Sequence, residues 1–334
     1  MAIDRIFELT MMLDSDRFQN VLDNALGRSE YIEDHDGEYV DYSVCEKGLI
    51  VIYRASQYKK KVRLLVNADI MLGSAETDPD KLIRKLRKRI EGYFGFEYSI
   101  NDFVLTGVTL INDIDVGNRE RVSAYLKVLK RIGKVKGFSP VSYDCLEMVA
   151  SFCLSGNSNG IDFMLYDLEN ALLLSSYTAN ASRRNHKAVS SRTTGILRAE
   201  VRLTKPKAIR HYTDASELSG QITALTRNSI GIFMDVFTRI IPPGDMYKKD
   251  KAADIIRSKV KDSKMRRRML RLLALIPEKK SLLLAQKAMN CRDVEKVMEA
   301  FAKINLSPVT IGKRQDAKCL KYLGEYLYIE KYLQ

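Results

Sequence analysis

The sequence predicts an α+β fold in which antiparallel sheets are flanked by helices and are followed by a helical region. Three patterns indicate this. Strand-like alternation and amphipathic helical segments follow one another up to about residue 215. The order strands, helix, strands occurs twice, which predicts two related β-rich halves with antiparallel pairing. From about residue 216 helical periodicity dominates, and a winged-helix-like arrangement is one form that such a region adopts.

Three domains follow from this pattern, because 334 residues are too many for one typical core. We predict an N-terminal α+β half at residues 1–120 and a second α+β half at residues 121–215. A helical C-terminal domain is predicted at residues 216–334.

The first half reads as strands with one well-delimited helix. Residues 5–13 and 42–72 have the β-rich character of strands. A helix is predicted over residues 78–95, because Asp, Pro and Gly stand at its cap, its first turn and its end. Its apolar residues fall on one face, so six basic residues between Lys81 and Arg89 cover the other face.

A strand over residues 102–117 and a basic amphipathic helix over residues 119–133 complete the pattern of the first β-rich unit. The strand ends in two acids, Asp113 and Asp115, which are two residues apart. They therefore lie on the same face of the predicted sheet.

The second half contains a predicted hairpin over residues 148–167, with its turn at Gly156–Gly160. A polar stretch follows, and then a strand in which Arg198, Glu200 and Arg202 alternate with apolar residues. These three side chains lie on one face of that strand.

The helical region is strongly basic in its middle. A helix over residues 216–241 stops at two prolines, and residues 248–271 contain eleven Lys or Arg against three Asp. Helix, turn and helix then follow in the order typical of a helix-turn-helix unit.

Composition favours a nucleic-acid partner. The net charge is +13 and the pI is near 9.4, and the basic residues are clustered along the chain. Neutralisation of phosphates by such residues provides most of the non-specific affinity for nucleic acid. No apolar run is long enough for a membrane span, and the first residues do not resemble a signal peptide, so we expect a cytoplasmic protein without a membrane partner.

Several classes of site are excluded by motif. The five cysteines show no CxxC spacing, which excludes an evident zinc ribbon or disulfide framework. There is neither a GxxxxGK[ST] loop nor a GxGxxG helix start, so we expect no nucleotide cofactor. The three histidines lie far apart in sequence, and nothing points to a Ser-His-Asp triad.

Carboxylates and one tyrosine are the candidates for chemistry. Asp113, Asp115 and Glu200 could provide hard oxygen ligands for Mg²⁺ or Mn²⁺. The alternative is that Glu200 forms salt bridges with its flanking arginines and that the two aspartates are merely exposed. Tyr166 is either a packed aromatic or a nucleophile, and a nucleophile would need a base and nearby cations.

A family resemblance rests on the order of these motifs. "FCLSGNSNGIDFMLYDLENALL", followed some thirty residues later by "GILRAEVRL", resembles the replication initiators of rolling-circle plasmids, phages and related conjugative elements. Upstream, "LTGVTLINDIDVGNRERVSAYLKVL" looks like the acidic strand and helix of that family. Downstream, "SLLLAQKAM" and "AFAKINLSPVTI" are similar to the helical tail of the phage-type members. The resemblance covers about two-thirds of the chain.

This resemblance implies a function for several positions. Tyr166 falls where the family has its DNA-nicking tyrosine, which attacks a phosphodiester to form a 5′-phosphotyrosyl intermediate. Glu200 falls on the family's strand glutamate, and Asp115, beside Asp113, falls near its metal-binding acid. The cofactor would be Mg²⁺ or Mn²⁺. Origin DNA, double- and single-stranded, would be the partner, and a host factor such as a helicase and a second copy in a homodimer are further candidates.

The DNA contacts are predicted on the two basic stretches of the chain. The first stretch, from residue 183 to residue 210, holds nine Lys or Arg against one Glu. The predicted contacts are Arg183, Arg184, Lys187, Arg192, Arg198, Arg202, Lys205, Lys207, Lys264, Arg266, Arg267, Arg268 and Arg271.

The sequence also departs from the family's pattern. Leu168 stands where the family has a lysine, Met164 where an arginine is common, and Thr109 where an acid is expected. Two alternatives to a nicking initiator therefore stay open: a non-catalytic DNA-binding initiator or regulator with the same fold, and a conjugative relaxase.

Overall fold

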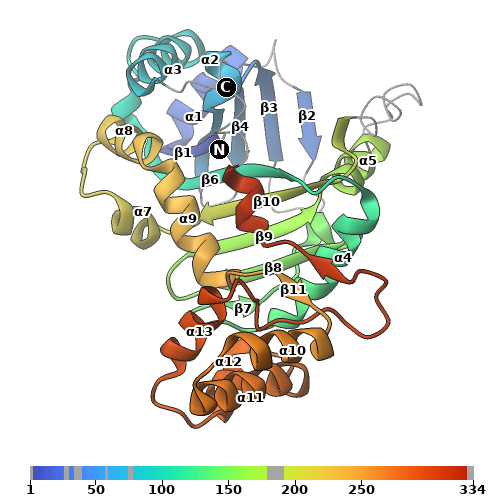
Figure 1. The fold of residues 1–334 in the computed structure, drawn as a ribbon. Helices are drawn as coiled ribbons and strands as arrows, with labels where there is room; N and C mark the ends of the chain where they lie inside the picture. Colours follow the sequence, from blue (N-terminus) through green and yellow to red (C-terminus); the bar gives the residue numbers. More distant parts are fainter. Residues whose placement is uncertain are drawn as a thin grey trace.

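The computed structural model describes residues 3–25, 30–33, 40–56, 59–73, 78–178 and 192–328 (Figure 1). Three of the predicted DNA contacts, Arg183, Arg184 and Lys187, lie outside these residues.

A single ten-stranded antiparallel sheet runs through the molecule in the order β2-β3-β4-β5-β1-β6-β10-β9-β8-β7. The α+β prediction is confirmed, with the difference that the predicted sheets are joined into one. The strands are β1 (Asp4–Leu13), β2 (Glu30–Glu33), β3 (Val40–Glu46), β4 (Leu49–Ala55), β5 (Lys60–Asn67), β6 (Val104–Asp115), β7 (Ser139–Pro140), β8 (Ser151–Gly156), β9 (Ile161–Asp167) and β10 (Ile196–Leu203).

The sheet consists of two halves that have the same strand arrangement. The first half is ordered β2-β3-β4-β5-β1 and the second β7-β8-β9-β10-β6, so each half places its first strand at the centre. There β1 and β6 pair antiparallel, with Phe7 opposite Val108. A helix follows each first strand, α1 (Ser15–Ala25) or α4 (Arg119–Leu129). By this order β6 belongs with the second half, although it precedes the predicted boundary at residue 120.

Helices cover one face of the sheet and form the main core with it. They include α2 (Ala68–Leu72), α3 (Pro79–Phe94), α8 (Leu218–Arg227) and α9 (Ser229–Ile240). Alternate strand residues such as Phe7, Leu64 and Phe163 point into this core and are buried. Phe163 meets Phe237 of α9 at 6.2 Å between ring centroids. Burying each such side chain contributes roughly 2 kcal/mol, so this face fixes the sheet on its helices.

The intervening strand residues form the second face, which we call the polar face. Glu8, Arg63, Arg198, Glu200 and Arg202 lie on it, in the register that strand pairing imposes. Helix α5 (Leu168–Thr178) follows β9 directly and packs at one end of this face. The polar face therefore carries Arg198, Glu200 and Arg202, which the sequence predicted to share one face of a strand.

The predicted hairpin of β8 and β9 is present, with its turn at residues 157–160. Gly160 has φ of 70°, and a Cβ there would lie 2.5 Å from the Cβ of Lys205. Only glycine fits a left-handed turn that lies so close to another segment of the same chain.

The C-terminal region is helical, as predicted. It consists of α10 (Lys249–Lys259), α11 (Ser263–Lys279), α12 (Leu282–Ala288) and α13 (Val294–Lys303). The short strands β11 (Met246–Tyr247) and β12 (Cys319–Leu320) pair with each other across the two ends of this helical module. The chain then returns to the main sheet as α14 (Leu323–Tyr328) (Figure 1).

Hydrogen bonds to Lys134 hold the module to the sheet-bearing part, and others join the two ends of the module to each other. Ser281 Oγ and the Leu283 amide both donate to the Lys134 carbonyl, at 3.2 and 3.0 Å. Buried Asp245 accepts hydrogen bonds from Lys321 Nζ at 3.0 Å and from the Tyr322 amide at 3.1 Å. Across the described ranges, no helix is both long enough and apolar enough to span a membrane.

Candidate functional site

Tyr166 and Glu200 are joined on the polar face. The Tyr166 hydroxyl donates a short hydrogen bond to Glu200 Oε1. Arg202 donates to the other carboxylate oxygen, from Nε at 2.9 Å and from Nη2 at 2.7 Å. Both oxygens of Glu200 are thus engaged by groups from β9 and β10, because the antiparallel register places these strands side by side.

Arg198 lies next to this group. In the strand register it stands opposite Tyr166 on one side and opposite Asp113 on the other. Its Nε and Nη2 bind the two oxygens of Asp113 at 2.7 and 2.8 Å, a bidentate pair. Two guanidinium groups therefore flank the tyrosine and its carboxylate.

Tyr166 is packed as well as hydrogen-bonded. Its exposed fraction is 8%, and it belongs to a small apolar cluster with Leu146, Val149, Cys153 and Met164. Leu146 and Val149 come from the connection between β7 and β8, residues 141–149, which we call the cover segment. The cover segment, together with α5, therefore closes this end of the polar face over the tyrosine.

Burial has an electrostatic consequence for the phenol. It raises the pKa of Tyr166 well above the ordinary tyrosine value, and the charge of Glu200 and the hydrogen bond to it raise the pKa further. Arg198 and Arg202 oppose this increase. The side chain therefore holds its proton at neutral pH and needs an acceptor in order to act as a nucleophile.

The predicted metal ligands are not gathered into one site. Asp113 is bound by Arg198 and Glu200 by Tyr166 and Arg202, while Asp115 accepts the Gly117 amide at 2.8 Å. Within the part of the chain that the structure describes, no three His, Cys, Asp or Glu side chains are grouped to hold a metal ion. The residues present do not fit the predicted Mg²⁺ or Mn²⁺ in this arrangement.

A cavity of ≈ 410 Å³ lies beside the tyrosine. Its lining includes Tyr143 and Leu146 of the cover segment and Ser151 and Cys153 of β8. Ser151 stands directly opposite Tyr166 in the β8–β9 pairing. The cavity is within the size range of small-ligand sites, and it is lined by both polar and apolar groups.

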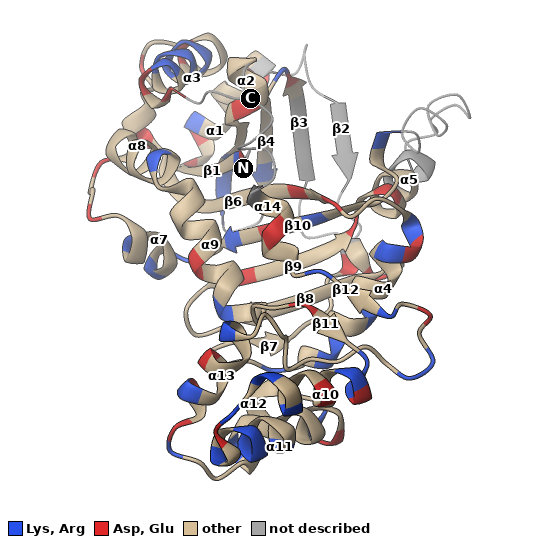
Figure 2. Cartoon of the chain, in the orientation of Figure 1, with Lys and Arg blue, Asp and Glu red and all other residues tan. Residues whose placement is uncertain are grey.

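The predicted DNA contacts that the structure describes do not form one surface. Arg198 and Arg202 flank Tyr166, whereas those of the second basic stretch lie on α11, in the helical module (Figure 2). On α11, Lys264, Arg267 and Arg271 are exposed, and Arg266 and Arg268 are half-buried.

The remaining predicted contacts of the first stretch are exposed and do not surround the tyrosine. Lys205 Nζ donates to the Asn157 carbonyl at 2.5 Å, at the opposite end of β9 from Tyr166. Lys207 is on α7 (Pro206–Tyr212), where it lines a separate cavity with Arg210 and Arg239. Arg192 precedes β10.

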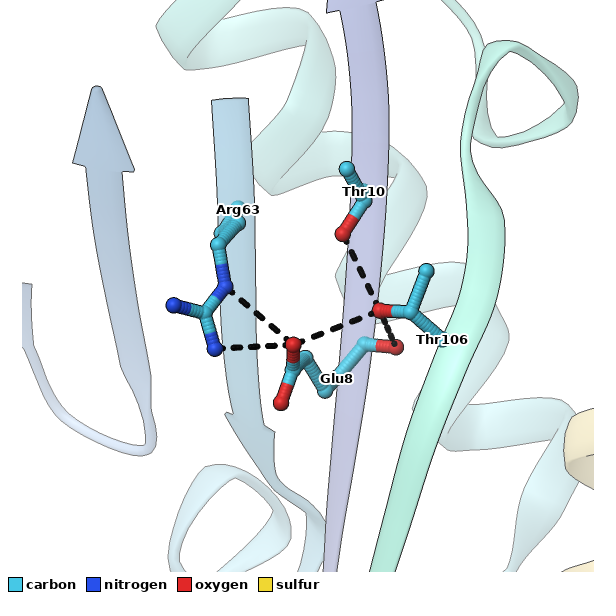
Figure 3. Close-up of polar contacts among 4 residues, drawn as sticks. All are labelled: Glu8, Thr10, Arg63 and Thr106. Atoms are coloured by element: carbon cyan, nitrogen blue, oxygen red, sulfur yellow. Dashed lines mark hydrogen bonds and ion pairs between the residues drawn. The ribbon is translucent and has the colours of Figure 1, made fainter. Parts of the chain in front are cut away.

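Sequence reasoning missed a second polar cluster on the polar face, at the seam between the two halves of the sheet (Figure 3). Arg63 binds Glu8 Oε1 from Nε at 3.1 Å and from Nη2 at 2.8 Å. Thr106 Oγ1 donates to the Glu8 carbonyl at 3.2 Å and lies 3.0 Å from Thr10 Oγ1. The alternation of Glu8 and Thr10 with apolar residues in β1 was the signal available. The cluster links β5, β1 and β6 across the seam between the halves.

A buried acid beside the site was also missed. Glu169, 2% exposed, accepts Arg119 Nε at 2.7 Å and Thr194 Oγ1 at 3.1 Å. These contacts tie the first turn of α5 to the start of α4 and to the segment before β10. They hold the helix that follows Tyr166, and only the fold brings their partners together.

Comparison with known proteins gives structural likeness without a match in sequence. No family model matches the chain, and no curated protein matches its sequence. Among solved structures, a similar chain is that of a rolling circle replication initiator protein from Geobacillus stearothermophilus. The two are 12% identical with a TM-score of 0.33, over 93% of this chain and 99% of the other. A similarity at this level carries no argument about function.

Proposed function

We propose that this protein is a DNA-binding replication initiator that nicks one DNA strand with Tyr166. One observation carries the proposal: the Tyr166 hydroxyl donates to the carboxylate of Glu200, and Arg198 and Arg202 stand on either side. A weak nucleophile hydrogen-bonded to a base, with cations beside it, is what attack on a phosphodiester requires.

The proposed reaction is a transesterification. Tyr166 Oη attacks phosphorus, and its proton passes to Glu200 Oε1 as the P–Oη bond forms. The bond from phosphorus to the 3′-oxygen breaks, and the proton held by Glu200 passes through water to this oxygen, which leaves a free 3′-hydroxyl and an ionised Glu200. The phosphate remains attached to Tyr166 at the 5′ end of the cut strand. No nucleotide is consumed, because one phosphodiester replaces another.

The arginines have distinct tasks in this scheme. Arg202 holds Glu200 through two hydrogen bonds and keeps Oε1 aimed at the phenol. Arg198 would approach the negative charge that grows on the phosphoryl oxygens, a role worth about 10²–10³ in rate for one well-placed donor. Metal assistance by Mg²⁺ or Mn²⁺ stays a prediction, and we derive no step through it.

Binding of origin DNA is part of the same proposal. The exposed cations of α11, Lys264, Arg267 and Arg271, would hold duplex DNA, because phosphate contacts provide most of the affinity. Host factors such as a helicase, a homodimeric state and a role in conjugative transfer stay predictions.

A non-catalytic DNA-binding initiator is the second candidate. The burial of Tyr166 favours it, because an exposed fraction of 8% leaves little room for a phosphate at Oη. The raised pKa of this phenol points the same way. In this reading Tyr166 and Glu200 are a structural pair that joins β9 to β10.

One experiment separates the two candidates. The protein is incubated with labelled single-stranded oligonucleotides from its own replicon, with and without Mn²⁺, and covalent adducts are resolved on a denaturing gel. We expect an adduct that disappears in Tyr166→Phe, whereas Tyr143→Phe, a matched tyrosine of the cover segment, retains it. Absence of any adduct, while duplex origin DNA is still shifted on a native gel, would establish the non-catalytic candidate.

A further inference from the structure

We propose that the outer face of α3 is a second surface for the phosphate backbone of nucleic acid, separate from Tyr166 and from α11. The inference takes the nucleic-acid partner from the proposed function but does not depend on nicking. It rests on which of the six Lys and Arg side chains of this helix have partners within the protein and which face solvent.

Two of the six cations have structural partners. Lys85 Nζ donates to the Met71 carbonyl at 2.9 Å, which ties α3 to α2. Arg89 forms an ion pair with Glu46 at the end of β3. These contacts fix the helix on the sheet and leave neither side chain fully free for a ligand.

The other four cations face solvent. Lys81, Arg84, Arg87 and Lys88 are exposed, and none makes an ion pair or a side-chain hydrogen bond with any residue that the structure describes. Lys81, Arg84 and Lys88 are spaced at three and four residues, so they lie along one stripe of about 10 Å.

The stripe is held on a rigid support. Leu82, Leu86 and Ile90, on the opposite side of α3, are at most 1% exposed in the main core. An array of charges on a fixed helix loses little backbone entropy when a ligand binds, unlike charges on a mobile tail.

A merely solvated helix face would be expected to pair its charges. Elsewhere the chain does so: Arg257 binds Asp254 at 2.9 Å, and Arg239 lies 3.4 Å from Asp235. On α3 the spacing would allow Asp80 to pair with Arg84 and Glu91 with Arg87, yet neither pair is formed. The four cations therefore present uncompensated charge, which suits the regular array of phosphates on DNA.

The position of α3 makes this a separate surface. Figure 2 shows Lys and Arg gathered on α3 at one end of the molecule and on α10 and α11 at the other, with the sheet between them. The two basic surfaces would therefore contact nucleic acid at separate places.

The test measures how affinity depends on salt. In a Tyr166→Phe background, which removes any covalent adduct, Lys81, Arg84, Arg87 and Lys88 are all changed to Gln, which retains helix propensity. The dissociation constant for a 60-base-pair duplex is measured over a series of NaCl concentrations. Each lost phosphate contact lowers the slope of log K against log salt by about 0.9, so we expect a decrease of about 3 to 4. Between 50 and 200 mM salt this corresponds to roughly a 10²-fold smaller change in affinity.

A matched control uses the two cations that already have partners. Lys85→Gln with Arg89→Gln should lower the melting temperature and leave the salt slope unchanged, while the quadruple variant should melt like its parent.

A salt slope in the quadruple variant within one unit of the parent would overturn the proposal. An unchanged slope together with lost binding of polyglutamate would also overturn it, and would assign the face to an acidic protein. Adduct formation is measured separately, with the protein that retains Tyr166. Failure of the nicking proposal would therefore not affect the interpretation of the salt slopes.

Discussion

Tyr166 meets two requirements that usually belong to different residues. Its ring packs with Leu146 and Met164, as in a core, and its hydroxyl donates to Glu200, as in an active site. A buried phenol needs a hydrogen-bond partner in any case, which costs about 1–3 kcal/mol if it is missing. The choice of a carboxylate as that partner, with an arginine on each side, distinguishes this tyrosine from an ordinary core residue.

Changing Glu200 to Gln tests its role as proton acceptor. The amide keeps the size of the side chain but accepts a proton poorly, so adduct formation should fall by about 10²–10⁴-fold. Duplex binding by α11 should not change. The rates are compared with that of Glu8→Gln, which alters the other carboxylate–arginine cluster of the polar face. An undiminished rate in Glu200→Gln would remove Glu200 from the mechanism.

Elements delimited by local signals could be predicted from the sequence. Helix α3 begins with Asp78 as cap and Pro79 in the first turn, and the β8–β9 hairpin turns at residues 157–160, because caps and turns depend on neighbouring residues. The alternation along β10 likewise placed Arg198, Glu200 and Arg202 on one face.

Pairings between distant segments could not be predicted. The register that sets Arg198 between Asp113 and Tyr166 depends on which strands become neighbours, and nothing local specifies this. The burial of Tyr166 depends on the cover segment. The cross-strand partners of Asp113 and Glu200, two of the carboxylates expected to bind a metal, likewise depend on this register.

The cover segment predicts an effect in which activity and stability change in opposite directions. Leu146, 7% exposed, packs on the cluster around Tyr166. Leu146→Ala should lower stability by about 2 kcal/mol, as large-to-small core changes do, and should expose the phenol. We expect adduct formation to become faster although the protein unfolds at lower urea. Met148→Ala, at an 84% exposed position of the same segment, serves as the control. A slower rate in Leu146→Ala would show that the cover segment supports the site and does not shield it.

At the scale of the molecule, buried and half-buried tyrosines predict sensitivity to alkaline pH. Burial is the largest cause that raises the pKa values of Tyr125, Tyr143, Tyr166 and Tyr212, which come from different parts of the fold. A pKa that is higher in the folded than in the unfolded state contributes stability below the ordinary value of about 10 and loses it as pH rises.

The free energy of unfolding should therefore be nearly constant from about pH 7 to 9 and fall steeply above about pH 10. Urea denaturation at each pH provides the measurement. Tyr212→Phe, which removes the phenol bonded to Asp235 at 2.7 Å, should make the fall shallower. An equally steep fall in Tyr212→Phe and in a variant that also carries Tyr166→Phe would assign the loss to other groups.

The pairing of β1 with β6 explains why the two halves of the sheet occur together in one chain. Each half of the sheet ends there in a strand with one unpaired side, and only the other half covers it. An unprotected strand edge recruits whatever strand it meets. A polypeptide with only one half would thus form a dimer through this edge. When two such units are linked in tandem, the same strand pairing forms within one chain. The two units are then free to diverge, and here one half pairs Glu200 with Tyr166 while the other pairs Glu8 with Arg63.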